Sequence, residues 1–263
     1  MAHEKIALVD PIEKLADYSE KMGLGPLWVR RGLAIKTKPS ASPVAPSSAP
    51  TKKSKTSHLE PVAKETIFDP TQPIPSWEAL KEAVEKCQRC GLAKTRQHTV
   101  FGRGSTDARW LLVGEAPGKN EDEQGLAFVG RAGKLLDNML KAIHLDSNTD
   151  VFMTNVLKCR PPGNRNPEEK EVIACQDFLS LQIAKIKPSL IITLGRFAIQ
   201  ALLNSKENIS ALRGKVHYYQ AIPLIVTFHP AYLLRNPPEK AKVWQDLVLA
   251  VQTQQEINLK QSS

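Results

Sequence analysis

The stretch ARWLLVGEAPG, residues 108–118, joins a short apolar run to a glycine-containing turn that carries a carboxylate. A run this short and this apolar is typical of a strand buried on both faces of a sheet. Outward from it, similar runs alternate with segments of helical periodicity, which predicts a three-layer α/β/α fold around a mostly parallel sheet. The expected strands are 108–115, 150–159, 189–195, 214–219 and 222–228, and the expected helices are 130–143, 166–188, 196–203 and 238–252.

The turn after the first strand does not match the phosphate-binding loops. A P-loop needs G-x-x-x-x-G-K-[ST], but Gly114 and Gly118 are one residue too close, and Asn120 stands where the magnesium-binding hydroxyl belongs. The dinucleotide fingerprint G-x-G-x-x-G is also absent, and Glu115 and Glu121 would repel a triphosphate. A carboxylate metal site and a plain turn followed by a solvated acidic loop stay open.

Several polar or aromatic residues follow the expected strands. Because parallel strands bring their carboxyl ends to one edge, Glu115, Asn155 and His229 are expected to meet there. Phe128, on the loop that precedes residues 130–143, adds an aromatic ring. The structural alternatives are a hydrogen-bonded buried amide for Asn155, a structural histidine for His229 and a hydrophobic plug for Phe128. Together they offer the stacking and edge-reading groups that a flipped base requires. The apolar and cationic tip that would fill the vacated space comprises Leu233, Leu234 and Arg235, unless these residues form the first turn of the last helix.

The four cysteines occur as Cys87-x2-Cys90 and, much later, Cys159-x15-Cys175. A C-x-x-C loop presents two thiolates to one ion, and four cysteines suit either zinc or an iron–sulfur cluster. Cys175 also lies on the apolar face of a helical pattern, so a buried core thiol is the alternative. A thioredoxin-like redox pair is disfavoured because no strand precedes Cys87.

Composition limits the classes of partner and location. The net charge of +9 favours a polyanion such as nucleic acid, although it could also serve solubility alone. No apolar run is long enough for a membrane helix, and the N-terminus lacks an apolar signal region, so we expect a cytoplasmic protein without a membrane partner.

A linker divides the chain. Residues 37–75 hold eight of the 19 prolines with many Ser, Thr and Lys, which predicts a disordered linker. It separates an N-terminal segment, 1–36, from a main domain, 76–257, and a short tail, 258–263.

Four motifs in order resemble the family 4 uracil-DNA glycosylases of the iron–sulfur type. They are GEAPG with ED (114–118, 121–122), FVGRAGKLLD (128–137), TNVLKCRPPGNR (154–165) and HPAYLLRNP (229–237), and the cysteine positions match too. The resemblance covers roughly residues 76–257 and implies a DNA repair enzyme that flips uracil out of DNA and hydrolyses its N-glycosidic bond. We also expect the protein to be a monomer. The alternatives are a glycosylase for another deaminated base and a non-catalytic nucleic-acid-binding module with a four-cysteine metal site.

The resemblance also implies roles for individual residues. Phe128 would stack on uracil, Asn155 would read its O4/N3 edge, and His229 would sit at O2, where charge develops. Glu115 and Glu121 would line the pocket with Ala116 and position the water, and Leu234 with its neighbours would fill the vacated space. The ligands of a [4Fe–4S] cluster would be Cys87, Cys90, Cys159 and Cys175.

Two features depart from related glycosylases. Better-known members have an aspartate before the motif proline as water activator, and here that position is Ala116, which excludes a carboxylate general base there. A related subgroup forms a covalent adduct with DNA through a histidine in an inserted loop. No such insertion follows residues 130–133, so turnover rather than trapping is expected.

The N-terminal segment contains a short amphipathic piece at residues 16–33 with a tryptophan and paired arginines. It weakly resembles the N-terminal peptide of the psi subunit of bacterial DNA polymerase III. An aromatic peptide on a long linker favours docking to a replication or repair protein, and a small helix that folds back on the domain is the alternative.

Overall fold

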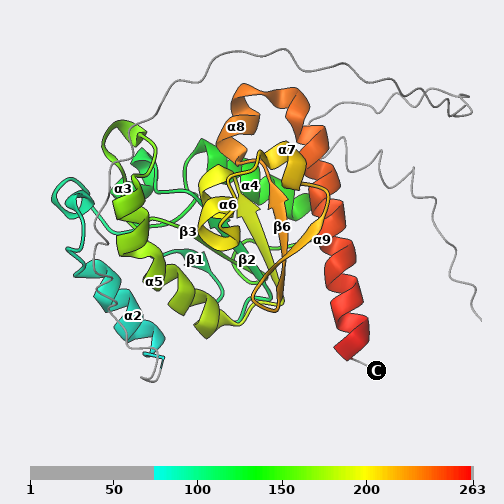
Figure 1. Cartoon of the computed structure of the whole chain (residues 1–263), viewed down its shortest axis with the longest axis horizontal. Helices are drawn as coiled ribbons and strands as arrows, with labels where there is room; N and C mark the ends of the chain where they lie inside the picture. Colours follow the sequence, from blue (N-terminus) through cyan, green and yellow to red (C-terminus); the bar gives the residue numbers. More distant parts are fainter. Residues whose placement is uncertain (1–73, 262–263) are drawn as a thin grey trace, which may run out of the picture.

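A six-stranded sheet forms the centre of the protein in a computed structural model that describes residues 74–261 (Figure 1). The strand order is β1-β3-β2-β4-β6-β5. The four inner strands are parallel, and β1 and β5 pair antiparallel at the two edges. The strands are β1 (Arg103–Gly104), β2 (Trp110–Gly114), β3 (Val151–Asn155), β4 (Leu190–Leu194), β5 (Val216–Tyr219) and β6 (Ile222–Thr227).

Helices cover both faces of this sheet. The first face packs against α2 (Trp77–Glu85), α5 (Glu169–Ile186), α6 (Arg196–Leu203) and α7 (Ile209–Leu212). The second packs against α4 (Arg131–Ala142), α8 (Pro230–Arg235) and α9 (Lys240–Gln261), which is red in Figure 1. The short α3 (Lys119–Gln124) and three 3-10 turns (Gly91–Lys94, Pro162–Asn164 and Pro237–Glu239) complete the described elements.

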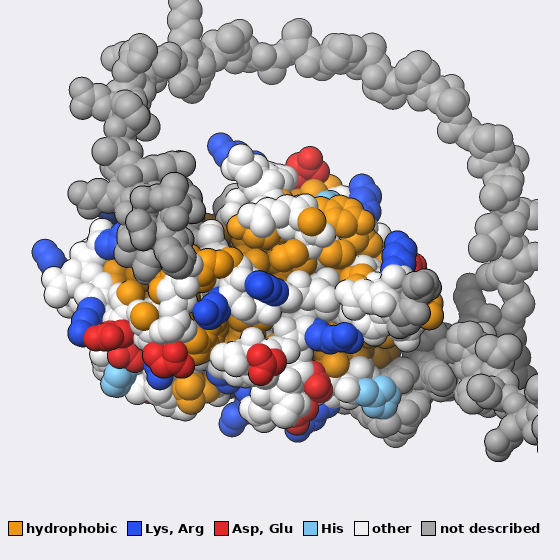
Figure 2. Space-filling model, turned by 90° about the horizontal axis from the view of Figure 1, so that it is seen from below, with side chains coloured by type: hydrophobic (Ala, Val, Ile, Leu, Met, Phe, Trp, Pro, Cys, Tyr) orange, Lys and Arg blue, Asp and Glu red, His pale blue; other side chains and the backbone are white. Residues whose placement is uncertain are grey.

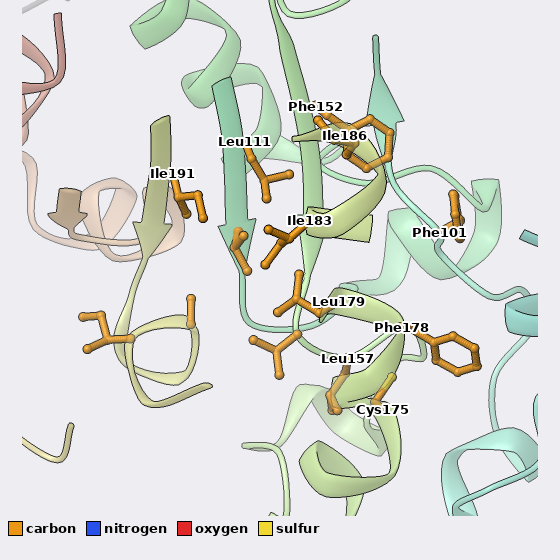
Figure 3. Close-up of a cluster of buried hydrophobic side chains, with 14 of the residues drawn as sticks. Phe101, Leu111, Phe152, Leu157, Cys175, Phe178, Leu179, Ile183, Ile186 and Ile191 are labelled. Atoms are coloured by element: carbon orange, nitrogen blue, oxygen red, sulfur yellow. The ribbon is translucent and has the colours of Figure 1, made fainter. Parts of the chain in front are cut away.

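The alternation of side chains along each strand supplies both cores. On β2, Leu111 and Val113 join the cluster under α5, whereas Trp110 and Leu112 join the cluster under α4 and α9. All five residues of β2 are buried, as they are on β3 and β4, because helices lie on both sides. Figure 3 shows the first cluster, with Cys175 of α5 beside Leu157 at its lower end.

On the face shown in Figure 2, positive and negative side chains are scattered without an extended field of one sign, and apolar side chains gather in the upper part of the view. Within residues 74–261, none of the helices combines the length and the apolar character needed to cross a membrane.

The sequence-based fold class is confirmed, and the differences have local causes. The helix expected from Asn166 begins at Glu169, because Glu168 and Glu171 form a reciprocal capping box that places the cap two residues later. The last helix runs to Gln261 and takes in most of the expected tail. The two-residue β1 is too short to leave a periodic signal. The expected N-terminal segment and almost all of the linker lie outside the described residues.

Candidate active site and four-cysteine cavity

A cleft of about 1090 Å³ opens at the carboxyl ends of β2, β3, β4 and β6. The parallel register aligns Gly114 with Asn155 across β2 and β3, and His229 follows β6 by two residues. This is the edge at which open α/β sheets bind ligands. Seven of the expected site residues line the cleft, namely Glu115, Ala116, Glu121, Phe128, Asn155, His229 and Arg235.

Asn155 ends β3 with its side chain inside the cleft, and it is only 2% exposed. Within the described residues its Oδ1 atom has no hydrogen-bond partner. A buried amide oxygen without a partner costs roughly 1–3 kcal/mol, so such an atom points to a donor supplied by a ligand. Gly114 makes room for it, because a Cβ there would lie 2.4 Å from Asn155 Oδ1 and 2.6 Å from Cζ of Phe128.

Phe128 places its ring in the cleft near Gly114 and His229. The ring is 5% exposed and packs against Gly114, and its centroid is 6.0 Å from that of His229 with the planes 30° apart. The Phe128 backbone has φ of 55°, in the left-handed region. For a bulky residue this conformation costs about 1–3 kcal/mol, so surrounding contacts must hold it. The aromatic face is therefore fixed at one side of the cleft.

His229 is the N-cap residue of α8. Its Nδ1 accepts a hydrogen bond from the Ala231 amide at 3.1 Å, so in the neutral ring the proton resides on Nε2. Burial, with a smaller contribution from the Arg235 charge, lowers the pKa of His229 to about 4. The turn after the neighbouring strand β4 allows this placement, because Gly195 has φ of 90° and a Cβ there would lie 3.1 Å from Cβ of His229. The cleft thus holds a neutral imidazole with one N–H available as a donor.

Two carboxylates line the cleft in different settings. Burial raises the pKa of Glu115, and the Arg196 guanidinium partly opposes that shift. Glu121 is anchored instead: its Oε1 accepts the Gly130 amide at 2.8 Å. A Cβ on Gly118 would lie 2.7 Å from Oε2 of Glu121, so this carboxylate is closely packed against the turn. Of the two side chains, Glu121 is therefore the more constrained in position.

The three residues of the expected wedge separate in the structure. Leu233 is fully buried and packs into the core beneath α8, which corrects the expectation that it lies at the tip. Leu234 is 39% exposed and Arg235 is also exposed, so these two form the outer surface of the short helix. The helical turn separates them because residues one apart point to different sides.

The four cysteines line one cavity on the α5 side of the sheet, although they come from three distant segments. Cys159 and Cys175 are buried, and Cys87 and Cys90 are half-buried. Cys159 Sγ accepts from Arg96 Nη1 at 3.2 Å, and Cys175 Sγ accepts from the Lys158 amide at 3.3 Å. Among residues 74–261, no three His, Cys, Asp or Glu side chains are grouped as ligands of a single metal ion.

Burial makes the free thiolates of this cavity costly. It raises the pKa of the Cys175 thiol to about 12, and it also raises the pKa of Cys90 and Cys159. Thiolates here therefore need positive charge close by, either a bound metal centre or neighbouring cations. The cavity meets that condition in part, because Arg96 and Lys158 line it.

Sequence reasoning missed Lys158, which directly precedes Cys159. Its side chain is 1% exposed, and Nζ donates to Thr154 Oγ1 at 2.6 Å, to the Asn155 carbonyl at 2.7 Å and to Gln182 Oε1 at 2.7 Å. Burial lowers the Lys158 pKa to about 8, and Cys175 and Cys159 oppose that shift. The signal that could have identified it is a lysine in the otherwise apolar run after β3.

Arg103 of β1 was also missed. Its guanidinium donates to the carbonyl oxygens of Ala127 and Phe128 and pairs with Asp137 of α4. A single arginine in the loop FGRG gives no sequence signal for these contacts.

Comparison with known proteins agrees with this geometry. Residues 101–248 match the model of the uracil DNA glycosylase superfamily. A type-4 uracil-DNA glycosylase of Saccharolobus solfataricus is 45% identical over 177 residues, which is 64% of this chain and 82% of that protein. The type-4 enzyme of Thermotoga maritima is 43% identical over 161 residues, covering 60% and 83% of the two chains.

A more distant relative is the type-5 uracil-DNA glycosylase of Pyrobaculum aerophilum, which is 28% identical over 151 residues, covering 51% of this chain and 66% of that protein. The type-4 enzyme of the same organism is 39% identical over 180 residues and covers 65% and 91% of the two chains. The resemblance stated from the motifs is thereby confirmed, and the chain belongs to the type-4 uracil-DNA glycosylases.

Proposed function

We propose that this chain removes uracil from DNA by hydrolysing the N-glycosidic bond, which leaves an abasic site for base excision repair. The observation that carries the proposal is the buried Oδ1 of Asn155 without a partner among the described residues, beside the ring of Phe128. An acceptor next to an aromatic plate matches a flat base with an N–H on its edge. The names of the type-4 relatives support the same reaction.

The Asn155 amide accounts for the choice of base. Its Oδ1 would accept from N3–H of uracil, while its NH₂ group would donate to O4. Cytosine presents an acceptor at N3 and a donor at the 4-position, so both contacts would become repulsive. A site built to hydrogen-bond a substrate rejects an analogue strongly, because its buried polar groups are then left unpaired. Phe128 would stack on the base without distinguishing between the two pyrimidines.

His229 would stabilise the leaving group. As the glycosidic bond breaks, negative charge collects on O2 of uracil, and the Nε2–H of the neutral imidazole would donate to that oxygen. One such preorganised donor lowers the activation barrier by about 3–4 kcal/mol. The Ala231 amide holds the ring orientation through Nδ1, so the donor is in place before the charge develops.

The carboxylates would act on the sugar side of the reaction. Loss of uracil leaves an oxocarbenium-like sugar, which nearby negative charge stabilises. Glu115, whose pKa is raised by burial, would hold the water that attacks C1′. Glu121 would contribute through its charge and its anchoring of the turn, since Oε1 is already occupied by the Gly130 amide. Ala116 supplies no carboxylate, so the water is positioned from its neighbours.

The outer parts of the cleft would hold the DNA strand. Four cations line it, namely Arg165, Arg196, Lys206 and Arg235. Phosphate contacts of this type position the duplex without reading sequence. The exposed Leu234 and Arg235 at the outer surface of α8 would occupy the space that the flipped nucleotide leaves.

The four thiols fit a [4Fe–4S] cluster, and we propose that Cys87, Cys90, Cys159 and Cys175 hold it. The donor set supports this, since all four cysteines line one cavity and each is a free thiol. When bound, such a group would supply a structural link between the Cys87–Cys90 loop, the segment after β3 and α5. Visible absorbance and stoichiometric iron in the purified protein would support the cluster, whereas colourless protein with zinc would overturn it.

The reaction is tested with a labelled oligonucleotide that contains one uracil, followed by alkali to cleave abasic sites. We expect cleavage at uracil and none at thymine in the matched strand, and we expect Asn155→Ala to lose at least about 100-fold of the rate. The control is Asn138→Ala, which removes an exposed amide from α4. An Asn155→Ala variant with the wild-type rate would overturn the assignment, and a folded wild type without cleavage would overturn the reaction.

For the N-terminal segment, which lies outside the described residues, we propose docking to a replication or repair protein through residues 16–33 of a monomeric cytoplasmic enzyme. An aromatic peptide on a proline-rich linker supports this. Pull-downs with the full chain and with a chain that lacks residues 1–36 test it, and an identical set of captured replication proteins would refute it.

A further inference from the structure

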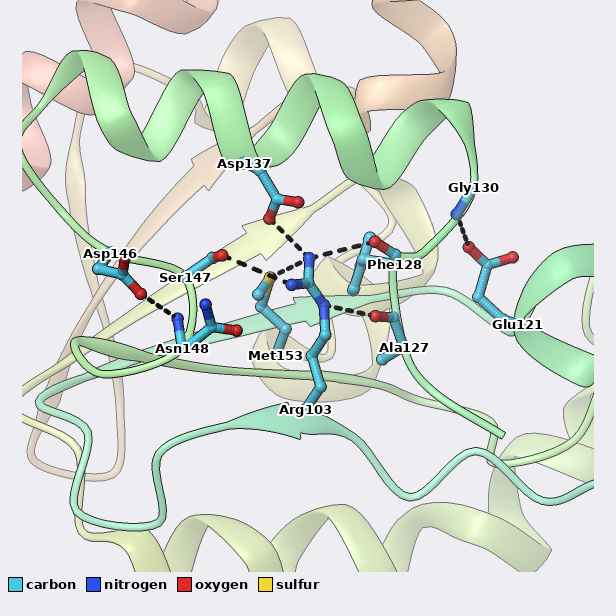
Figure 4. Close-up of polar contacts among 10 residues, drawn as sticks. All are labelled: Arg103, Glu121, Ala127, Phe128, Gly130, Asp137, Asp146, Ser147, Asn148 and Met153. Carbon is cyan, nitrogen blue, oxygen red and sulfur yellow. Dashed lines mark hydrogen bonds and ion pairs between the residues drawn. The ribbon is translucent and has the colours of Figure 1, made fainter. Parts of the chain in front are cut away.

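The ring of Phe128 can act as a plate only if its loop is held. Residues 125–130 connect α3 to α4, and the loop has a left-handed backbone at Phe128. Nothing in the side chain of Phe128 itself favours that conformation. The contacts that stabilise it must come from outside the loop, and Figure 4 shows where they originate.

Arg103 of β1 binds the loop backbone at two consecutive carbonyls. Its Nε donates to the Ala127 oxygen at 2.8 Å, and Nη2 donates to the Phe128 oxygen at 3.1 Å. The planar guanidinium has donors in a fixed fork, so two carbonyls held by one fork cannot rotate independently. Figure 4 shows the guanidinium facing this stretch of backbone from the β1 side.

Neighbouring side chains fix the guanidinium itself. Asp137 Oδ1 on α4 accepts from Nη2 at 2.6 Å, and Ser147 Oγ lies 3.5 Å from Nη1. The two charged side chains are 16% and 26% exposed, so the pair is largely removed from solvent. Partly buried arginine–carboxylate pairs have a defined geometry that exposed pairs lack.

Two further contacts complete the hold on the loop. A Cβ at Gly133 would lie 1.7 Å from the Phe128 oxygen, so the carbonyl can pack against α4 only because residue 133 has no side chain. At the other end of the loop, the Gly130 amide donates to Glu121 at 2.8 Å. The loop is therefore tied by its carbonyls to Arg103 and by an amide to Glu121.

We propose that Arg103, oriented by Asp137, is a positioning residue that holds the ring of Phe128 against the flipped base. This inference rests on the proposed uracil-excision function. Arg103 is not among the residues that line the cleft, so it acts on the substrate through the Phe128 loop. Loss of the guanidinium frees both carbonyls and lets the loop leave the left-handed conformation.

The test is a double-mutant cycle in full-length protein, with single-turnover cleavage of the uracil oligonucleotide and inhibition by free uracil as readouts. We expect Arg103→Ala to lower kcat/KM by about 30-fold and to raise the inhibition constant of uracil. In a Phe128→Ala background the same substitution should cost less than about 3-fold, because the plate is already gone. Arg103→Lys should recover only part of the loss, since an ammonium cannot hold both carbonyls as a fork.

Controls separate this inference from general destabilisation and from the function itself. Arg109→Ala removes an exposed arginine that donates to Asn258 of α9 and makes no described contact with the Phe128 loop, so it should leave both readouts unchanged. If Arg103→Ala does not fold, Asp137→Asn weakens the same pair more gently and should show the same dependence on Phe128. Equal effects of Arg103→Ala, or of Asp137→Asn, in both backgrounds would overturn the inference. A Phe128→Ala variant with the wild-type rate would instead overturn the stacking role.

Discussion

The cleft and the four-cysteine cavity adjoin the same segment of chain, but the buried polar groups of the two regions differ in their hydrogen bonding. Asn155 is the last residue of β3, Cys159 follows it by four residues, and Lys158 lies between them in the sequence. In the cleft, the side-chain oxygen Oδ1 of Asn155 has no partner among the described residues. Toward the cavity, the Lys158 ammonium donates to three acceptors. An acceptor without a partner suits a binding surface where the substrate supplies the hydrogen bond, whereas an ammonium with three acceptors suits an interior where folding supplies all partners.

This contrast predicts that substitutions in the cleft change rate without stability, and that substitutions in the cavity change stability first. The largest effect is expected for His229→Ala, which should lower the single-turnover rate by about 100- to 1000-fold. The free energy of unfolding should fall by only about 1 kcal/mol, because the variant loses the N-cap hydrogen bond from the Ala231 amide. Rate and midpoint are measured on the same preparation. A near-wild-type rate would exclude the proposed role of the imidazole at O2.

The cavity is tested with Cys175→Ala. We expect loss of visible absorbance and iron, and a stability loss of about 3 kcal/mol, which corresponds to roughly 6–12 °C in a domain of this size. The rate per folded molecule should fall far less than in His229→Ala. Iron analysis, melting and single-turnover kinetics give the three quantities. Retention of iron and midpoint would contradict the ligand assignment.

Gly114→Ala tests whether the cleft depends on a missing side chain. The new Cβ would lie 2.4 Å from Asn155 Oδ1 and 2.6 Å from Phe128 Cζ, so one of the two must move. A displacement of this size should lower the rate by about 10- to 100-fold. Gly91→Ala is the matched control, because a Cβ there has no atom within 4 Å. Similar rates for both variants would show that the packing around Gly114 is not required.

The smallest effect concerns pH. The pKa of His229 falls from 6.5 to about 4 in the folded protein, so the unfolded chain binds the proton more readily between these values. The stability that the neutral ring contributes is therefore complete above pH 6.5 and is lost as pH falls toward 4. The difference in unfolding free energy between wild type and His229→Gln should shrink over that range. Nitrogen-15 NMR should also find a neutral ring with the Nε2 proton at pH 6, and titration near 6.5 would contradict this.

The sequence was most informative where function follows directly from strand ends. Asn155 and His229 could be identified because parallel strands deliver their carboxyl ends to one edge. The number and spacing of the four cysteines predicted that they share one site, although only the folded chain brings Cys87 and Cys175 to one cavity. The motif order then supplied the family, which the comparisons confirm.

What the sequence could not provide depends on packing between distant segments. Arg103 contacts a loop 24 and 25 residues away, and Lys158 contacts Gln182 24 residues away. Neither pattern has a period or motif. Leu233 and Leu234 are adjacent and chemically identical, yet one is fully buried and the other 39% exposed, which only the exact rotation of α8 decides.

His229 has a second role as the N-cap of α8, and this ties the imidazole mechanically to the helix that carries Leu234 and Arg235. Pro230 follows His229 with a fixed φ, and the Ala231 amide donates to Nδ1 of the His229 ring, so the ring has little freedom to move relative to the helix. In the proposed function, a displacement of α8 against DNA would therefore also displace the imidazole. Opening of the double helix and alignment of the Nε2–H donor would then be a single movement rather than two successive ones.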